Sequence, residues 1–127
     1  MNGKKIVVVE DSIVRGTTLK SLTKLLREAG AKEVHIRVSS PPIKHPCFYG
    51  LDFPDEDDLI ANNMSIEEMR EFLGVDSLEY LSIEGMLSAS DLEMNDFCSA
   101  CFSGDYPIPI KENETQDKAR YEMEEVI

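Results

Sequence analysis

Residues 6–18 read Ile6-Val-Val-Val-Glu-Asp-Ser-Ile-Val-Arg-Gly-Thr-Thr18. Four apolar, β-branched residues are followed by two acids, and a short turn then leads into an amphipathic helical pattern. A buried β-branched run is typical of a strand in a parallel sheet. Open α/β sheets bind their ligands at the carboxyl ends of the strands. The segment therefore predicts a strand, a ligand-binding turn and a helix, in that order.

The turn has the chemistry of a site for a phosphorylated sugar. Its backbone N–H groups, the positive end of the helix dipole and the hydroxyls of Thr17 and Thr18 suit a phosphate. Two carboxylates, Glu10 and Asp11, could accept hydrogen bonds from vicinal sugar hydroxyls. The alternative is an ordinary strand–turn–helix junction with solvated acids. The order of strand, acid pair and turn favours the sugar-phosphate site.

This segment resembles the phosphoribosyl pyrophosphate (PRPP) signature of the type I phosphoribosyltransferases. Its form Val9-Glu-Asp-Ser-Ile-Val-Arg-Gly-Thr-Thr18 is closest to that of the glutamine amidophosphoribosyltransferases. The resemblance implies that Glu10 and Asp11 bind the ribose hydroxyls and a Mg²⁺ ion. It also implies a loop for the 5′-phosphate, whose substrate-binding residues would be Ser12, Arg15, Gly16, Thr17 and Thr18. The family more often has Asp at this position, and the side chain of Glu10 is longer than that of Asp.

The remaining pattern predicts an α/β fold with three strands, over residues 5–9, 33–39 and 78–81. A helix is expected after the turn, ending before Gly30, with its inner face made by Leu19, Leu22, Leu25, Leu26 and Ala29. A short helix is expected to start near residues 57–62. The capping box Ser65-Ile-Glu-Glu68 predicts a helix that ends before Gly74. Ser82 is expected to cap a short helix through about residue 89, and residues after 90 are expected to be irregular.

At 127 residues the chain is at most one domain. The resemblance divides it into residues 1–110, the C-terminal part of a phosphoribosyltransferase domain, and residues 111–127, a polar tail. Type I phosphoribosyltransferases have a parallel sheet of about five strands, and their amidotransferase members carry a glutaminase domain upstream. We therefore expect a partial type I fold: a parallel sheet with flanking helices and an irregular C-terminal segment, without the glutaminase domain.

Three cysteines form a second group. Cys98-Ser-Ala-Cys101 is a C-x-x-C pair, and Cys47 lies in a loop that contains prolines. Taken alone, such residues in an intracellular protein bind a metal, take part in redox chemistry or remain free thiols. A zinc site of the three cysteines with His45 is one alternative, although its spacing is unusual for zinc.

The resemblance gives these cysteines a more specific role. Many family members hold a [4Fe–4S] cluster with four cysteines. Two stretches match three of those ligands: Ser40-Pro-Pro-Ile-Lys-His-Pro-Cys-Phe-Tyr-Gly50 and Cys98-Ser-Ala-Cys-Phe-Ser-Gly104. The resemblance thus implies that Cys47, Cys98 and Cys101 are cluster ligands and that the fourth ligand is missing from this chain. A companion polypeptide or a small thiol could supply it. Without the cluster, we expect a loose C-terminal segment.

Composition limits the partners. The net charge is −12 and the isoelectric point is near 4.5, which argues against nucleic acid or an anionic membrane as partner. The acids are concentrated at 52–58, 67–71 and from 112 onward, and they predict a solvated acidic face. No apolar run approaches the roughly 20 residues that span a bilayer. The first residues do not resemble a signal peptide, so we expect an intracellular, cytoplasmic protein.

The resemblance implies an enzyme, a glycosyltransferase that opens purine biosynthesis. Its reaction converts PRPP, glutamine and water to 5-phosphoribosylamine, glutamate and pyrophosphate. No catalytic set of its own is visible in this chain, so we expect it to act only with the remainder of the enzyme or a companion chain. The family is homo-oligomeric. One alternative is a PRPP-binding or interaction module without catalysis. Another is a different phosphoribosyltransferase, against which the cysteine loops argue.

Overall fold

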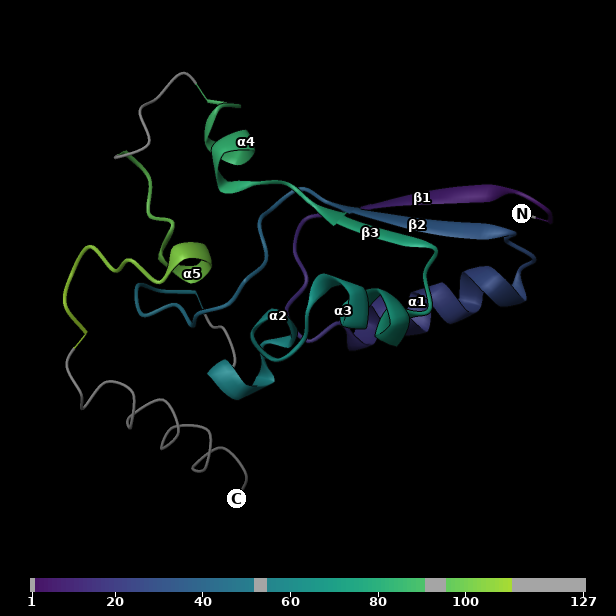
Figure 1. Ribbon diagram of the computed structural model, residues 1–127, viewed down its shortest axis with the longest axis horizontal. Coiled ribbons are helices and arrows are strands. Elements are labelled where there is room, and N and C mark those ends of the chain that lie inside the picture. Colours follow the sequence, from purple (N-terminus) through teal and green to yellow (C-terminus); the bar gives the residue numbers. More distant parts are fainter. Residues whose placement is uncertain (1, 52–54, 91–95, 111–127) are drawn as a thin grey trace.

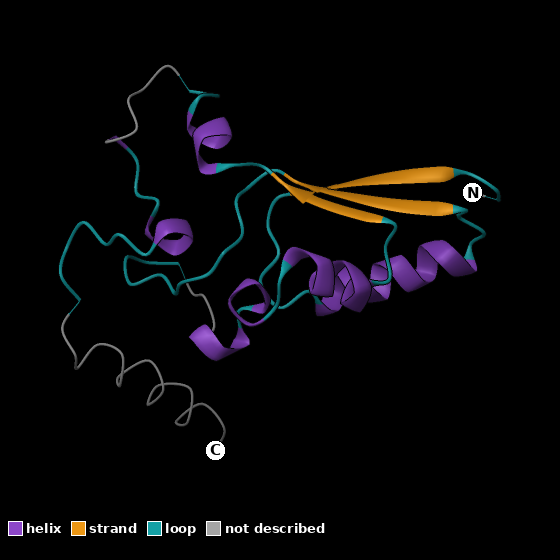
Figure 2. Cartoon of the chain, viewed as in Figure 1, coloured by secondary structure: helices purple, strands orange, loops and turns teal. Residues whose placement is uncertain are grey.

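A computed structural model describes residues 2–51, 55–90 and 96–110. Its centre is a parallel sheet of three strands in the order β1-β2-β3 (Figures 1 and 2). The strands are β1 (Lys5–Glu10), β2 (Glu33–Val38) and β3 (Ser77–Tyr80). Their register places Val8 beside Ile36, and Ile36 beside Leu78. The predicted α/β class and all three strands are confirmed, with bounds that differ by one residue.

Five helices and one 3-10 turn connect and follow the strands in the described residues. They are α1 (Thr17–Glu28), η1 (Glu56–Asp58), α2 (Ile60–Asn63), α3 (Ile66–Leu73), α4 (Ile83–Leu87) and α5 (Ala100–Ser103). Figure 1 shows α1, α2 and α3 together on one side of the sheet. The segment that contains α5 extends beyond the carboxyl ends of the strands. This end of the sheet also carries the turn between β1 and α1.

The core lies between the sheet and the helices on that side. It contains Val34, Ile36 and Val38 of β2, packed with Leu19 and Leu26 of α1 and with residues of α3. The predicted inner face of α1 is only partly correct. Residues 19, 23 and 26 are buried, whereas Leu22 is 38% exposed and Leu25 is 62% exposed. A sheet of three strands covers only a narrow stripe of the helix, at positions i, i+4 and i+7.

The apolar run of β1 is also less buried than predicted. Ile6 and Val8 face the helices and pack against the core, but Val7 and Val9 are 61% and 73% exposed. Among the described elements, β1 is an edge strand, and the helices that cover the sheet are all on the other face. Side chains of a strand alternate between faces, so every second valine of this run is left uncovered.

The helix ends follow the expected capping chemistry. The Ser65 hydroxyl accepts from the backbone N–H of Glu68, whose carboxylate accepts from the N–H of Ser65, so the predicted capping box is confirmed. Gly74 ends α3 with a φ of 70°. Ser82 caps α4 through the N–H of Gly85, and α4 ends at Leu87, two residues early. Helix α5 was not predicted, because a single turn carries no periodic apolar pattern.

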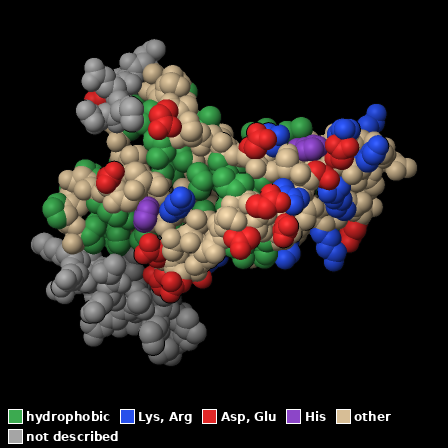
Figure 3. Space-filling view, in the orientation of Figure 1, with side chains coloured by type: hydrophobic (Ala, Val, Ile, Leu, Met, Phe, Trp, Pro, Cys, Tyr) green, Lys and Arg blue, Asp and Glu red, His purple; other side chains and the backbone are tan. Residues whose placement is uncertain are grey.

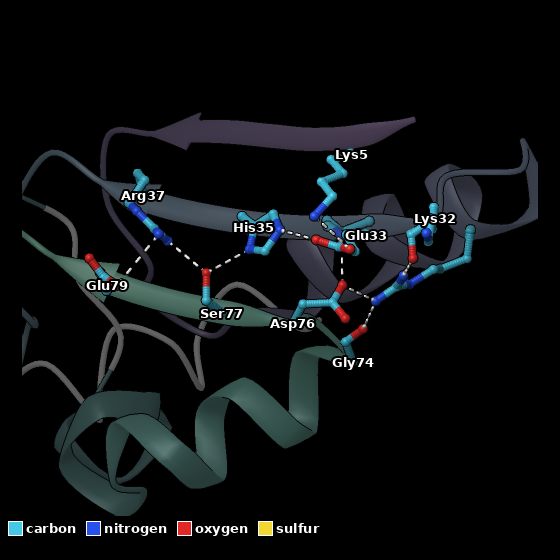
Figure 4. A network of polar contacts seen from close by, with 11 residues as sticks. Lys5, Lys32, Glu33, His35, Arg37, Gly74, Asp76, Ser77 and Glu79 are labelled. Atoms are coloured by element: carbon cyan, nitrogen blue, oxygen red, sulfur yellow. Dashed lines mark hydrogen bonds and ion pairs between the residues drawn. The ribbon is translucent and has the colours of Figure 1, made fainter. Parts of the chain in front are cut away.

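The uncovered face of the sheet carries a polar network (Figure 4). The amine of Lys5 lies 2.9 Å from the carboxylate of Glu33, and the His35 ring lies between Glu33 and the Ser77 hydroxyl. Arg37 donates to the same hydroxyl and pairs with Glu79. These cross-strand contacts tie the three strands together on the side without helices.

Candidate active-site turn and cysteine module

The turn between β1 and α1 forms a concave site at the carboxyl end of the sheet. A cleft of about 480 Å³ is lined by Glu10, Ser12, Ile13, Val14, Arg15, Gly16, Thr17, Thr18, Leu19 and Leu22. Helix α1 begins at Thr17, and Gly16 precedes it as the N-cap with a φ of 73°. This left-handed conformation suits glycine, which has no Cβ. Six of the seven predicted substrate-binding residues therefore line one cleft. Asp11 is exposed and adjoins it in the chain.

The two acids extend from a strand end that is held in place. The carbonyl of Glu10 accepts from the backbone N–H and the hydroxyl of Ser39, at 2.9 and 3.1 Å. The carboxylate of Asp11 accepts from the Ser12 hydroxyl at 3.1 Å. No ion pair with a Lys or Arg of the described residues engages either carboxylate. Both negative charges thus remain available to a cation or to sugar hydroxyls.

The segment formed by η1 and α2 contacts the turn between β1 and α1. The N–H of Ile60 donates to the carbonyl of Val14 at 2.9 Å, and Arg15 pairs with Asp58 at 2.7 Å. A Cβ at Gly16 would lie 3.1 Å from Cδ1 of Ile60. The predicted solvated acidic face agrees with Asp58, whose side chain is 54% exposed, but its ion pair with Arg15 was not predicted. Nothing in the local spacing indicates its partner, which is 43 residues away.

The loop that carries Cys47 and the segment that carries α5 lie against each other. The backbone N–H groups of Lys44 and His45 both donate to the carbonyl of Cys101, at 2.9 and 3.1 Å. The Tyr106 hydroxyl donates to the carbonyl of Pro46 at 2.7 Å. We call residues 41–50 and 96–110 the cysteine module. Two of the predicted cluster ligands, Cys47 and Cys101, come from segments that this module joins.

Aromatic rings complete the module. The Tyr106 ring makes edge-on contacts with Phe48 and Tyr49, at centroid distances of 5.3 and 6.2 Å. The Tyr49 hydroxyl donates to the carbonyl of Ile108 and accepts from its N–H, at 2.8 and 3.1 Å. These rings and hydrogen bonds attach residues 96–110 to the loop that carries Cys47, and the expected looseness of the C-terminal segment without a cluster stays a prediction.

None of the three cysteines forms a disulfide within the described residues. Cys98 is exposed, whereas Cys47 and Cys101 are half-buried. Burial raises the pKa of the Cys101 thiol, and the nearby Cys47 and then Cys98 raise it further. Within residues 2–51, 55–90 and 96–110, no three Cys, His, Asp or Glu side chains are arranged to hold a metal ion. This finding bears equally on zinc and on a cluster, so it does not separate the two; the His45 ring lies 3.6 Å from Glu56.

The comparisons with known proteins agree with this geometry. Residues 1–45 match the family model described as phosphoribosyl transferase domain. The amidophosphoribosyltransferase of Synechococcus elongatus is 53% identical over 120 residues, which cover 94% of this chain and 24% of that protein. The chloroplastic amidophosphoribosyltransferase 2 of Arabidopsis thaliana is 50% identical and covers 94% of this chain. The chain is a homologue of one segment of the amidophosphoribosyltransferases.

Solved structures support the same assignment. The glutamine PRPP amidotransferase of B. subtilis, complexed with ADP and GMP, aligns with a TM-score of 0.81 and 49% identity. The alignment covers 88% of this chain and 26% of that one. The chain thus spans about a quarter of the length of the amidophosphoribosyltransferases it matches, and its partial type I phosphoribosyltransferase fold is confirmed. No helix in the described residues is long and apolar enough to cross a membrane.

Proposed function

We propose that this chain forms the PRPP-binding part of an amidophosphoribosyltransferase. The complete reaction would convert PRPP, glutamine and water to 5-phosphoribosylamine, glutamate and pyrophosphate, the first step of de novo purine biosynthesis. The observation that carries the proposal is the cleft where the end of β1, the turn and the start of α1 meet. It combines the carboxylate of Glu10, next to that of Asp11, with a helix N-terminus, and together these groups suit a ribose and its phosphate.

Different residues at the cleft would bind different parts of the ligand. Glu10 and Asp11 would bind the ribose hydroxyls, and the turn from Ser12 to Thr18 would hold the 5′-phosphate. Ammonia derived from glutamine would attack C1 of the ribose as pyrophosphate leaves, through a transition state with oxocarbenium character. Protein groups would contribute by positioning the ribose phosphate and stabilising charge.

Magnesium fits the acid pair. Mg²⁺ is usually bound by one or two carboxylates together with water and substrate phosphates, rather than by a cage of protein ligands. Glu10 and Asp11 provide two such carboxylates next to the phosphate turn, so a third protein ligand is not required. The ion would neutralise charge on the departing pyrophosphate.

A [4Fe–4S] cluster is proposed for the cysteine module. Thiolates are the ligands that such clusters take, and Cys47, Cys98 and Cys101 come from two segments that hydrogen bonds and rings hold together. The fourth ligand would come from another polypeptide or a small thiol. The cluster would pin the C-terminal segment to the rest of the enzyme.

The chain would work with the remainder of the enzyme, in a cytoplasmic homo-oligomer. Two surfaces support a polypeptide partner. The first is the uncovered sheet face at β1, where Val7 and Val9 are exposed; parallel sheets are normally covered on both faces. The second lies on the cysteine module, where Tyr49, Phe97 and Ile108 are exposed, as is the adjoining Leu51. Figure 3 shows hydrophobic side chains on the surface between the sheet and the α5 segment.

A chimaeric enzyme tests the proposal. This chain would replace the matching segment of the Synechococcus elongatus relative, and PRPP-dependent pyrophosphate release would be measured. We expect turnover, and we expect Asp11→Asn to lower kcat/KM at least about tenfold, since a tenfold step corresponds to only about 1.4 kcal/mol. Asp105→Asn, the same change in the cysteine module, should have no such effect. A folded chimaera that binds PRPP without turnover would instead indicate an inactive binding module.

A further inference from the structure

We infer that Asp58 and Ile60 are positioning residues that hold the phosphate turn in its ligand-binding conformation before a ligand arrives. The inference rests on the proposed role of this turn in binding the 5′-phosphate of PRPP. Neither residue lines the cleft. Both act on residues 14–16, which do.

The first contact is between backbones. The Ile60 N–H donates to the carbonyl of Val14 at 2.9 Å, and Ile60 is the first residue of α2. The first N–H groups of a helix have no partner within the helix, so this donor is free to bind the turn. Leu59 and Ile60 are both buried, at 0% and 5% exposed, which fixes the donor relative to the core.

The second contact is an ion pair. The guanidinium of Arg15 lies 2.7 Å from the carboxylate of Asp58, the last residue of η1. Arg15 precedes Gly16, so the pair restricts the backbone next to the N-cap of α1. Because both side chains are more than half exposed, the pair contributes little to overall stability. Its contribution would be to the conformation of the turn.

The third contact explains why glycine is present in the turn. At Gly16 an added Cβ would meet Cδ1 of Ile60 at 3.1 Å and Cδ2 of Leu73 at 3.5 Å. The backbone of the turn therefore lies close to side chains of α2 and α3, and a side chain at this position would require them to shift. Asp58 and Ile60 thus restrict residues 15 and 14, and the packing of Ile60 leaves little room for a side chain at residue 16. A turn that is already held in one conformation loses less conformational entropy when it binds a phosphate.

The test measures turn order and ligand affinity separately, in the full chain. Amide hydrogen exchange would report on residues 12–18 without ligand, and calorimetry with PRPP and Mg²⁺ would give the affinity. We expect Asp58→Asn to speed exchange in the turn and weaken PRPP binding about two- to fivefold, as suits an exposed pair. Asp57→Asn removes the same charge one residue earlier and should change neither quantity. Asp58→Glu should restore both.

Two further variants separate positioning from general stability. The double variant Arg15→Gln, Asp58→Asn should lose less binding free energy than the two single variants lose together, because the two groups act as a pair. Ile60→Pro removes the donor and also shortens the buried side chain, at a helix position that tolerates proline, after an extended Leu59. It should loosen the turn more than Ile60→Val, which keeps the N–H.

The outcomes distinguish the two proposals. If the wild-type chain binds PRPP and Asp58→Asn changes neither exchange nor affinity, the positioning role is wrong. If Asp58→Asn and Asp57→Asn have equal effects, the result is a general charge effect and the role is also wrong. If the folded wild-type chain fails to bind PRPP, the proposed function fails, while the exchange comparison still decides whether Asp58 orders the turn.

Discussion

The carboxylate of Asp76 accepts a 2.6 Å hydrogen bond from the guanidinium of Arg27. The contact joins the last turn of α1 to the residue before β3. The same carboxylate oxygen accepts from the backbone N–H of Val34, at 2.7 Å (Figure 4). Because Val34 is fully buried, its N–H has no access to water. One side chain therefore fixes α1, β2 and β3 relative to one another, at the end of the sheet opposite the phosphate turn.

Replacing this carboxylate should destabilise the fold. Asp76→Ala leaves the buried N–H of Val34 without an acceptor, which costs about 1–3 kcal/mol in the free energy of unfolding. Urea denaturation followed by circular dichroism would measure the loss. The control is Asp57→Ala, which removes an exposed carboxylate from η1 and should cost less than about 0.5 kcal/mol. Equal effects of the two changes would mean that the Val34 contact contributes nothing specific.

The same carboxylate predicts a dependence on pH. The N–H of Val34, and after it Arg27, hold the pKa of Asp76 below its ordinary value of 3.8. A carboxyl whose pKa is lowered by folding contributes stability above its ordinary pKa and loses that contribution as the pH falls through the lowered value. The stability difference between the wild type and Asp76→Ala should therefore be constant from pH 7 to about 5 and shrink below 3.8. A difference that grew on acidification would contradict this account.

The tyrosines of the cysteine module should hold its C-terminal segment without metal. Tyr106→Phe keeps the ring contacts but removes the hydrogen bond to the carbonyl of Pro46, worth about 1 kcal/mol. We expect faster amide exchange over residues 96–110, measured by mass spectrometry on the metal-free chain. Tyr80→Phe removes a hydroxyl in the core and should leave that segment unchanged. Protection of 96–110 that survives Tyr106→Phe would show that other contacts are sufficient.

The proposed cluster gives a direct chemical prediction. After anaerobic incubation with iron and sulfide, the wild-type chain supplied with a small thiol should form a brown species that contains iron. Cys98→Ser removes one thiolate ligand and should prevent it, whereas Ser99→Ala, at the neighbouring position, should not. Iron per chain is the quantity to measure. An iron content unaffected by Cys98→Ser would exclude this residue as a ligand.

Local signals in the sequence predicted much of the fold. The strand at 33–38 alternates half-buried and buried residues as expected, and Ser65, Glu68 and Gly74 mark both ends of α3. The phosphate turn could be placed because strand, acids and Gly-Thr-Thr are contiguous. Each of these features depends on neighbours within a few residues, which is the range at which pattern reasoning works.

The features that the sequence did not predict depend on contacts between distant segments. Leu25 and Val9 have apolar side chains in periodic positions, but whether they are buried depends on how many strands and helices surround them. The pairing of Asp58 with Arg15 joins residues that no spacing rule connects. The attachment of residues 96–110 likewise depends on where Tyr49 and Tyr106 meet in space. Such contacts require the three-dimensional arrangement of the chain.

Calorimetric titration of the folded chain with PRPP and Mg²⁺ tests the central claim most directly. We predict saturable binding at one site, abolished by Asp11→Asn in a variant that remains folded by circular dichroism. Ribose 5-phosphate serves as the comparison, because it retains the ribose and 5′-phosphate but lacks the pyrophosphate. Absence of saturable binding to the folded wild-type chain, or an affinity for PRPP unchanged by Asp11→Asn, would contradict the assignment of this turn as the PRPP site.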